Sequence, residues 1–136
     1  MLITRETDYA LRILRTLALG ETRTVGELAE REVLPQKFAY KIIKKLEKAG
    51  IVAITRGASG GCRLSCDLRA VSLYDLVEAV ETNAKLFSCM TPGYVCEWRE
   101  SCSSVCTIHR QLAQLQKTMD EEFRSRSLHW ILYGET

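Results

Sequence analysis

The sequence lacks most of the groups and patterns that catalysis commonly needs. It contains only two histidines, it has no glycine-rich phosphate-binding loop, and it shows no acid and base paired around a nucleophile. General acid–base and nucleophilic catalysis depend on such groups. We therefore do not expect an enzyme.

Long apolar runs are also missing. The most apolar stretch, residues 9–19, is interrupted by Arg12 and Arg15, whereas a spanning helix needs about 20 mainly apolar residues. Residues 1–6 show no apolar core followed by a cleavage site, so we expect no export signal and no membrane partner. We expect a cytoplasmic protein, in which cysteines act as metal ligands or redox thiols rather than as disulfides.

The composition is that of a folded chain with unevenly distributed charge. Hydrophobic residues make up 46% and charged residues 26% of 136 residues, which suits one modest core with an accessory element. Residues 1–66 hold 12 Lys and Arg against 7 Asp and Glu, and residues 67–136 hold 7 against 10, so net charges of +5 and −3 sum to +2. A basic half favours a polyanionic partner.

The first half of the sequence predicts three helices. Thr4 is a favourable N-cap for a first helix that Gly20 ends. Residues 24–27 form a capping box that opens a short second helix, and Pro35 marks the turn after it. A strongly amphipathic third helix is predicted over residues 36–49. Its expected apolar face consists of Phe38, Ile42, Leu46 and Ala49.

The third helix carries a stripe of lysines on its other face. At 100° per residue, Lys37, Lys41, Lys44 and Lys48 lie within about 60° of one another. Solvated helix faces are often rich in lysine, but this one belongs to the second helix of a helix-turn-helix. Two short strands, residues 51–55 and 62–64, follow it around a glycine-rich turn and form a wing.

A helix of this kind fits the major groove of duplex DNA. The N-terminal part of a recognition helix usually contacts base edges, later lysines contact phosphates, and an arginine at a wing tip suits a minor groove or phosphate. The residues predicted to contact DNA are Gln36, Lys37, Tyr40, Lys41, Lys44, Lys45, Arg56 and Ser59.

The second half begins with another capping box, at Ser72 and Asp75, and ends with a long amphipathic helix. The apolar positions of that last helix are Ile108, Leu112, Leu115, Met119 and Phe123. The expected fold is mainly α: a winged helix-turn-helix with a small β-hairpin wing and a long C-terminal dimerisation helix. We expect residues 1–82 to form the DNA-binding domain and residues 83–136 to form a cysteine-rich loop with the dimerisation helix.

Four cysteines and a histidine fall in a segment without helix or strand periodicity. They are Cys89, Cys96, Cys102, Cys106 and His109. Cysteines that serve only packing should follow such a period. Zinc sites usually contain closely spaced cysteine pairs, which are missing here, whereas widely spaced thiolates suit an iron–sulfur cluster. We interpret Cys62 and Cys66, in and just after the wing, as structural.

With these residues considered together, the chain resembles the Rrf-two family of winged-helix regulators, which includes the IscR and NsrR types. The motifs that carry the resemblance are residues 7–12 (TDYALR), the helix-turn-helix, residues 56–61 (RGASGG) and residues 106–109 (CTIH). The resemblance implies a homodimer joined through the long helix, roughly palindromic operators, and a cluster that changes DNA affinity.

The resemblance also implies ligands. IscR-like members hold a 2Fe–2S cluster with three cysteines and a histidine, which Cys89, Cys106 and His109 would match in part. In NsrR-like members an aspartate from the first helix of the partner subunit completes a 4Fe–4S site, and Asp8 occupies that place. Asp8 equally suits a helix start, and His109 equally suits a helix surface.

This loop is longer than the compact family spacing. Either Cys96 or Cys102 can therefore supply the third thiolate, or all four cysteines can bind without Asp8 or His109. Some family members lack the cysteines and regulate through protein partners.

We expect a dimeric transcription factor, a repressor that affects RNA polymerase only indirectly. Its iron–sulfur cluster would sense oxidant, nitric oxide or iron supply. One alternative is a cluster-free zinc or thiol sensor on the same DNA-binding frame. An iron–sulfur carrier is a second alternative, but it leaves the lysine stripe and the wing unexplained.

Overall fold

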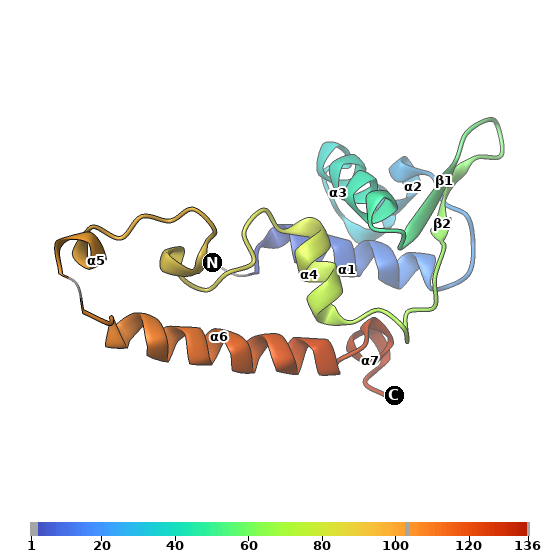
Figure 1. Ribbon diagram of the computed structural model, residues 1–136. Helices are drawn as coiled ribbons and strands as arrows, with labels where there is room; N and C mark the ends of the chain where they lie inside the picture. Colours follow the sequence, from blue (N-terminus) through green and yellow to red (C-terminus); the bar gives the residue numbers. More distant parts are fainter. Residues whose placement is uncertain (1–2, 103, 136) are drawn as a thin grey trace.

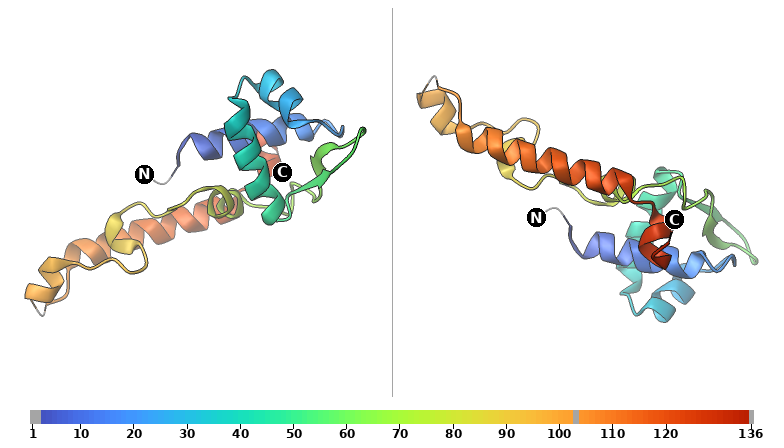
Figure 2. Two further views of the ribbon diagram at one scale, coloured as in Figure 1. Left: turned by 90° about the horizontal axis from the view of Figure 1, so that it is seen from above. Right: turned by 90° about the horizontal axis from the view of Figure 1, so that it is seen from below.

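The computed structural model describes residues 3–102 and 104–135. The chain forms a winged-helix body at one end and a long arm at the other (Figures 1 and 2). The body contains α1 (Arg5–Leu17), α2 (Val25–Glu32), α3 (Gln36–Lys48), β1 (Val52–Thr55), β2 (Gly61–Leu64), α4 (Leu73–Val80) and α7 (Leu128–Tyr133). The arm, residues 82–125, contains η1 (Ser88–Met90), α5 (Glu97–Ser101) and α6 (Thr107–Ser125). The mainly α winged-helix fold expected from the sequence is confirmed.

The predicted helix starts are present as hydrogen-bonded caps. The Thr4 hydroxyl accepts a hydrogen bond from the Glu6 amide at the start of α1. Complete capping boxes open α2 at Thr24 and α4 at Ser72. Each cap satisfies amide donors that a helix leaves without partners, so the helix boundaries follow from local sequence.

The buried face of α3 differs from the predicted one at two positions. Ala39, Ile42, Ile43 and Leu46 are buried, whereas Ala49 is the exposed C-cap residue. Phe38 is 47% exposed and lies edge-on against Tyr9, with ring centroids 6.1 Å apart. The prediction was wrong for Phe38 and Ala49 because the contact with α1 rotates the buried stripe toward Ala39 and Ile43.

The wing is a two-stranded antiparallel hairpin extended by one further bridge. Val52 pairs with Leu64 and Thr55 with Gly61, while Arg23 bridges to Cys62. A side chain at Gly60 would overlap the Thr55 carbonyl oxygen, and Gly61 has φ +152° against the Arg23 backbone. The glycines where the turn of the wing enters β2 are therefore required for its close backbone approach.

The chain returns to the body after the arm, which the sequence did not predict. Backbone hydrogen bonds join Leu73 to Arg126 and Leu128 to Val71, at 2.8 Å each. Leu128 is fully buried in the core that α1, α3 and α4 share. The C-terminal helix α7 thus attaches the C-terminal end of α6 to the body.

The arm itself has little packing of its own. Of the residues of α6, all of which the structure describes, only Gln116 is buried. Its side-chain oxygen accepts a hydrogen bond from the Leu86 amide at 2.7 Å, and its side-chain nitrogen donates to Asp120 at 2.8 Å. Gln116 therefore attaches the segment before Cys89 to α6. None of the described helices is long and apolar enough to cross a membrane.

Candidate DNA-binding surface and cysteine pocket

Helix α3 presents five of its six predicted contact residues to solvent, and the sixth, Lys45, is partly covered. Gln36, Lys37, Tyr40, Lys41 and Lys44 are all exposed. Pro35 caps the helix without a side-chain hydrogen bond, so the first amide groups of α3 are not covered by a capping side chain. This face has the shape, charge and accessibility that a helix needs to enter a major groove.

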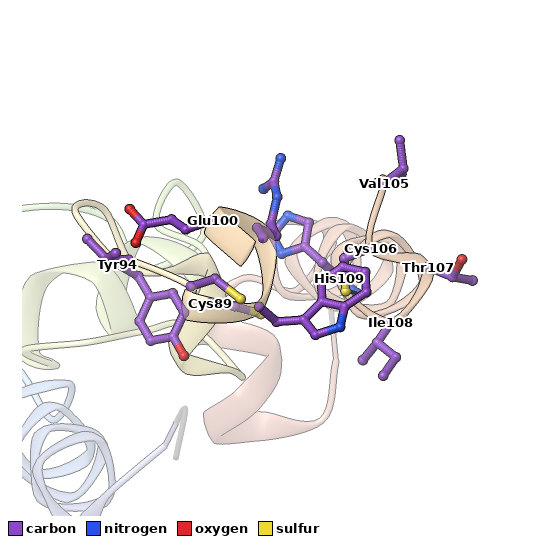
Figure 3. Close-up of a pocket in the computed structure, with 12 residues that line it drawn as sticks. Cys89, Tyr94, Glu100, Val105, Cys106, Thr107, Ile108 and His109 are labelled. Carbon is purple, nitrogen blue, oxygen red and sulfur yellow. Dashed lines mark hydrogen bonds between the residues drawn. The ribbon is translucent and has the colours of Figure 1, made fainter. Parts of the chain in front are cut away.

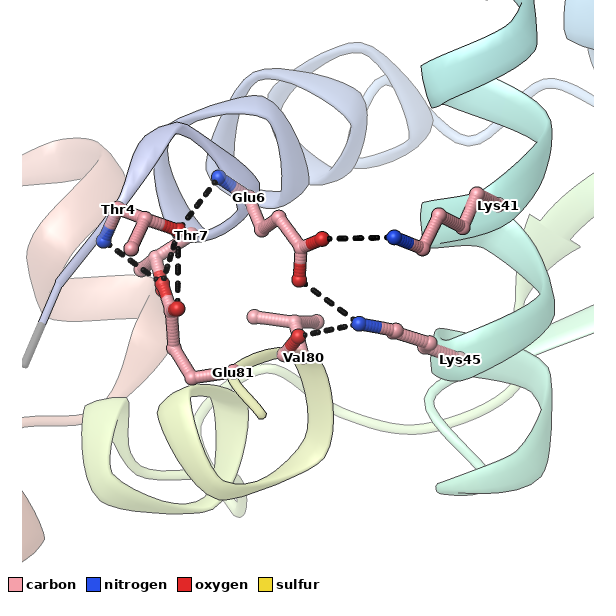
Figure 4. A network of polar contacts seen from close by, with 7 residues as sticks. All are labelled: Thr4, Glu6, Thr7, Lys41, Lys45, Val80 and Glu81. Carbon is pink, nitrogen blue, oxygen red and sulfur yellow. Dashed lines mark hydrogen bonds and ion pairs between the residues drawn. The ribbon is translucent and has the colours of Figure 1, made fainter. Parts of the chain in front are cut away.

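Lys41 and Lys45 meet the same carboxylate at the start of α1 (Figure 4). The Lys41 Nζ lies 3.1 Å from Glu6 Oε1, and the Lys45 Nζ lies 2.7 Å from Glu6 Oε2. The hydrogen bond from Lys45, aided by the one from Lys41, holds the pKa of Glu6 below its ordinary value. Glu6 is a negative charge on the same side of the body as two predicted DNA-contacting lysines.

Lys44 and the wing complete the predicted surface. The Lys44 Nζ lies 2.9 Å from Glu47 Oε1, and this exposed pair raises the pKa of Lys44. Arg56 and Ser59 are exposed at the tip of the hairpin. Figure 1 shows that the hairpin projects from the body beside α3, as the wing of a winged helix does.

The cysteine pocket lies at the free end of the arm. It has a volume of about 760 Å³ and is lined by residues of the loop, of α5 and of the first turn of α6. Cys89, Cys96, Cys106 and His109 are among its lining residues. Figure 3 shows Cys89, Cys106 and His109 among the side chains around the pocket.

The two remaining predicted ligands lie elsewhere. Cys102, the residue that ends α5, does not line the pocket. Asp8 lies on α1, where its carboxylate pairs with Arg12 at 3.0 Å. A single chain therefore brings together three of the four loop cysteines and His109, but neither Cys102 nor Asp8.

The donors around the pocket suit a thiolate-bound group in their chemistry. Three thiols and an imidazole are ligands that iron–sulfur clusters and zinc both accept. Within residues 3–102 and 104–135, however, no three ligating side chains lie close enough together to hold one metal ion. The Cys106 sulfur accepts a hydrogen bond from the His109 amide at 3.3 Å, so it also caps α6.

The two cysteines of the body have a different environment. Cys62 is buried in the core, and burial raises the pKa of its thiol. Burial likewise raises the pKa of the Cys66 thiol. A raised pKa disfavours the thiolate that binds metal or reacts, which supports the structural role assigned to both residues.

Comparison with known proteins identifies the family. The model of the Rrf2 family, described as iron-dependent transcriptional regulators, matches residues 3–134. The protein aau3 of Rhizobium meliloti is 30% identical over 82% of this chain and 75% of its own length. The transcriptional regulator NsrR of Shouchella clausii is 26% identical over 89% of this chain and 84% of its own length.

Solved structures share the fold. A transcriptional regulator from Listeria innocua has a TM-score of 0.76 at 23% identity, covering 98% of this chain and 88% of that one. CymR of B. subtilis, a global cysteine regulator, has a TM-score of 0.73 at 21% identity over 100% and 99%. IscR of T. potens has a TM-score of 0.72 at 19% identity over 98% and 88%. The chain belongs to the Rrf2 family of DNA-binding transcriptional regulators and is not an enzyme.

Proposed function

We propose that this regulator is a dimeric repressor whose operator affinity is controlled by an iron–sulfur cluster held in the cysteine pocket. The observation that carries the proposal is that Cys89, Cys96, Cys106 and His109 line one pocket although up to 19 residues separate them in sequence. The names of the IscR and NsrR relatives, and the iron-dependent description of the family, support it.

The DNA-binding surface consists of α3 and the wing. Gln36, Lys37 and Tyr40, in the first turns of α3, are exposed where a recognition helix meets base edges. Lys41 and Lys44 lie further along, where they would reach phosphates. Arg56 and Ser59 at the hairpin tip would contact the neighbouring backbone or minor groove.

In the sensor, Cys89, Cys96, Cys106 and His109 would hold the cluster, and Cys102 or an Asp8 from a second copy could replace one of them. When bound, the cluster supplies a centre that oxidant, nitric oxide or loss of iron can alter. The pocket is open to solvent, and its cysteines are neither buried nor packed into the core. Small oxidants therefore have access to the ligands.

We infer that a second copy of the chain covers the exposed apolar side chains of α6. Ile108 is 71% exposed and Leu115 58% exposed on α6, and such a stripe on a 19-residue helix is typical of a helix–helix interface. At 1.5 Å per residue α6 is about 28 Å long, so the pocket lies far from α3 of its own chain. In a dimer, α1 of the partner subunit could lie close to the cysteine pocket.

We therefore assign a separate role to each part of the chain. Residues 1–82 bind DNA, residues 83–136 sense and dimerise, and α7 joins the two by packing into the body. A protein of this kind works in the cytoplasm on double-stranded DNA, and it would affect RNA polymerase by occupying the operator.

A second candidate is a cluster-free zinc or thiol regulator on the same frame. Its thiol form is favoured by the fact that, among the described residues, no three ligating groups lie within reach of one ion, since reversible thiol chemistry needs no such group. The zinc form needs one just as a cluster does. An iron–sulfur carrier is not favoured, because it would not need the exposed lysines of α3 or the wing.

Anaerobic purification separates the candidates. The proposal predicts a coloured protein with iron and sulfide in equal amounts, and loss of both in Cys89→Ala and Cys106→Ala but not in the control Cys66→Ala. Comparing Cys96→Ala with Cys102→Ala, and His109→Ala with Asp8→Ala, would identify the remaining ligands. A colourless protein loaded with zinc, or one free of metal, would refute the cluster.

A further inference from the structure

Lys45 differs from the other lysines of α3 in what surrounds it. Its side chain is only 26% exposed, compared with 48% for Lys44. Its Nζ donates to Glu6 Oε2 and to the Val80 carbonyl oxygen, both at 2.7 Å. Two of the three donors of this ammonium group are therefore engaged inside the body, and its direction is fixed away from a phosphate contact.

Glu6 joins Lys45 to Lys41. Its two carboxylate oxygens accept from the two lysines separately, and its side chain is mostly covered. DNA is a polyanion, so a carboxylate beside α3 opposes binding unless cations neutralise it. In the free protein Glu6 shares its charge between Lys45, which is held inside, and Lys41, which is exposed.

Next to the Glu6–Lys45 pair, further hydrogen bonds fix the C-terminal end of α4 to α1 and α3. Glu81 accepts hydrogen bonds from the Thr4 amide at 2.8 Å, from the Thr4 hydroxyl and from the Thr7 hydroxyl at 2.6 Å (Figure 4). The Val80 carbonyl oxygen next to it receives Lys45. Val80 and Glu81 are the last residues before the chain enters the arm, so α1, α3 and the root of the arm meet at one polar network.

We propose that Glu6 and Lys45 form a positioning pair that sets the recognition helix against α1 and the root of the arm. Lys45 does not contact DNA, and Glu6 is an internal counter-anion that Lys41 leaves when it reaches a phosphate. This inference rests on the proposed DNA contacts of α3, and it replaces the predicted contact at Lys45 with a structural role.

The geometry implies opposite effects for the two members of the pair. Loss of the Lys45 ammonium group removes the hydrogen bonds that fix α3 against α1 and the end of α4, which lowers DNA affinity without removing a phosphate contact. Loss of the Glu6 charge releases Lys41 and removes a repulsion. Because exposed ion pairs are weak, the expected gain from Glu6→Gln is about two- to fivefold in affinity at low salt.

Titration of a fluorescent duplex of random sequence at several salt concentrations tests the inference. Lys44→Met, the matched control, should flatten the plot of log affinity against log salt by about one unit. Lys45→Met should weaken binding but leave that slope unchanged. Glu6→Gln should strengthen binding, and Lys41→Met in the Glu6→Gln background should remove the gain.

The outcomes separate this inference from the proposed function. A slope that falls by one unit in Lys45→Met, while Lys44→Met behaves as expected, would overturn the positioning role alone. Unchanged slopes in both Lys44→Met and Lys41→Met, or a wild-type protein that does not bind the duplex, would overturn the DNA surface and the inference together. If Lys45→Met does not fold, as its thermal melt will show, weaker binding by Glu6→Gln would itself contradict the proposal.

Discussion

The body and the arm of this regulator are stabilised in different ways. The body buries a continuous set of aliphatic side chains from α1, α2, α3, α4 and the wing, whereas α6 buries one polar residue. Burial of apolar surface is the main favourable contribution to folding. The body therefore has a continuous apolar core, and none of the described arm residues belongs to it. Under the proposed function, a second copy and the group bound by the cysteines would stabilise the arm instead.

The largest effect is expected from a substitution in the core of the body. Ile42 is fully buried in α3, so Ile42→Ala should lower the free energy of unfolding by about 2–5 kcal/mol, the usual cost of a large-to-small change in a packed core. Denaturant unfolding followed by circular dichroism measures this loss. The exposed Ile108→Ala is the matched control, and an equal loss of helix stability in both would remove the contrast between body and arm.

A substitution on the exposed face of α6 should weaken the dimer rather than lower the free energy of unfolding of the body. Leu115→Asp places a charge in the proposed interface and should weaken the dimer about 10- to 100-fold, since central interface residues commonly contribute about 1.4–2.7 kcal/mol. Sedimentation velocity at several concentrations measures the dissociation constant. Lys117→Asp, at an exposed position on the opposite face of the same helix, serves as the control. A dimer insensitive to Leu115→Asp would place the interface elsewhere.

The ion pair between the buried Glu32 and the exposed Arg15 predicts that stability depends on acid pH. Glu32 accepts hydrogen bonds from Arg15 and from the Thr16 hydroxyl, and the bond from Arg15 holds the pKa of Glu32 below its ordinary value of 4.5. The stabilisation is thus fully present above the unfolded-state pKa and is lost as pH falls through the lower folded-state pKa.

Glu32→Gln should consequently cost about 1–2 kcal/mol at neutral pH and less below pH 4. Urea unfolding of both proteins across that pH range measures the difference. Glu30→Gln, at an exposed position of the same helix, should show neither effect. A constant difference at all pH values would contradict the ion-pair account.

The smallest expected effect concerns the hydrogen bond that joins the Leu86 amide to Gln116 of α6. Gln116→Leu removes the acceptor for the Leu86 amide and should destabilise that contact by about 1 kcal/mol. Hydrogen exchange at Leu86 should accelerate about fivefold, while exchange in α1 should not change. The control is Gln114→Leu, at an exposed position of α6. Equal exchange at Leu86 in both variants would show that this hydrogen bond does not hold the loop.

Local signals in the sequence were enough to predict helices α1 to α4 and the hairpin of the body. Thr4, Thr24 and Ser72 started helices where caps were predicted, and the glycine-rich turn gave the hairpin. The exposure of Phe38 and Ala49 was not predictable, because it depends on the angle at which α1 crosses α3. Helical period alone cannot give that angle.

The candidate sites were predictable in kind but not in detail. The lysine stripe identified the helix, yet nothing local distinguished Lys45 from Lys44, because the difference comes from Glu6 and Val80, 39 and 35 residues away. Cysteine composition pointed to one sensor site, but only the path of the loop separates Cys102 from the other three. The return of α7 was missed because residues 128–133 are too few for a clear period.

The central claim is that the state of the cysteine pocket controls DNA affinity. The most direct test is a binding titration of one anaerobic preparation, before and after removal of its iron, on a duplex that the protein itself selects from a random pool. The account predicts that affinity changes by about 5- to 150-fold, the usual range of allosteric coupling, and that Cys89→Ala shows no such change. Equal affinity with and without iron in the wild-type protein would contradict it.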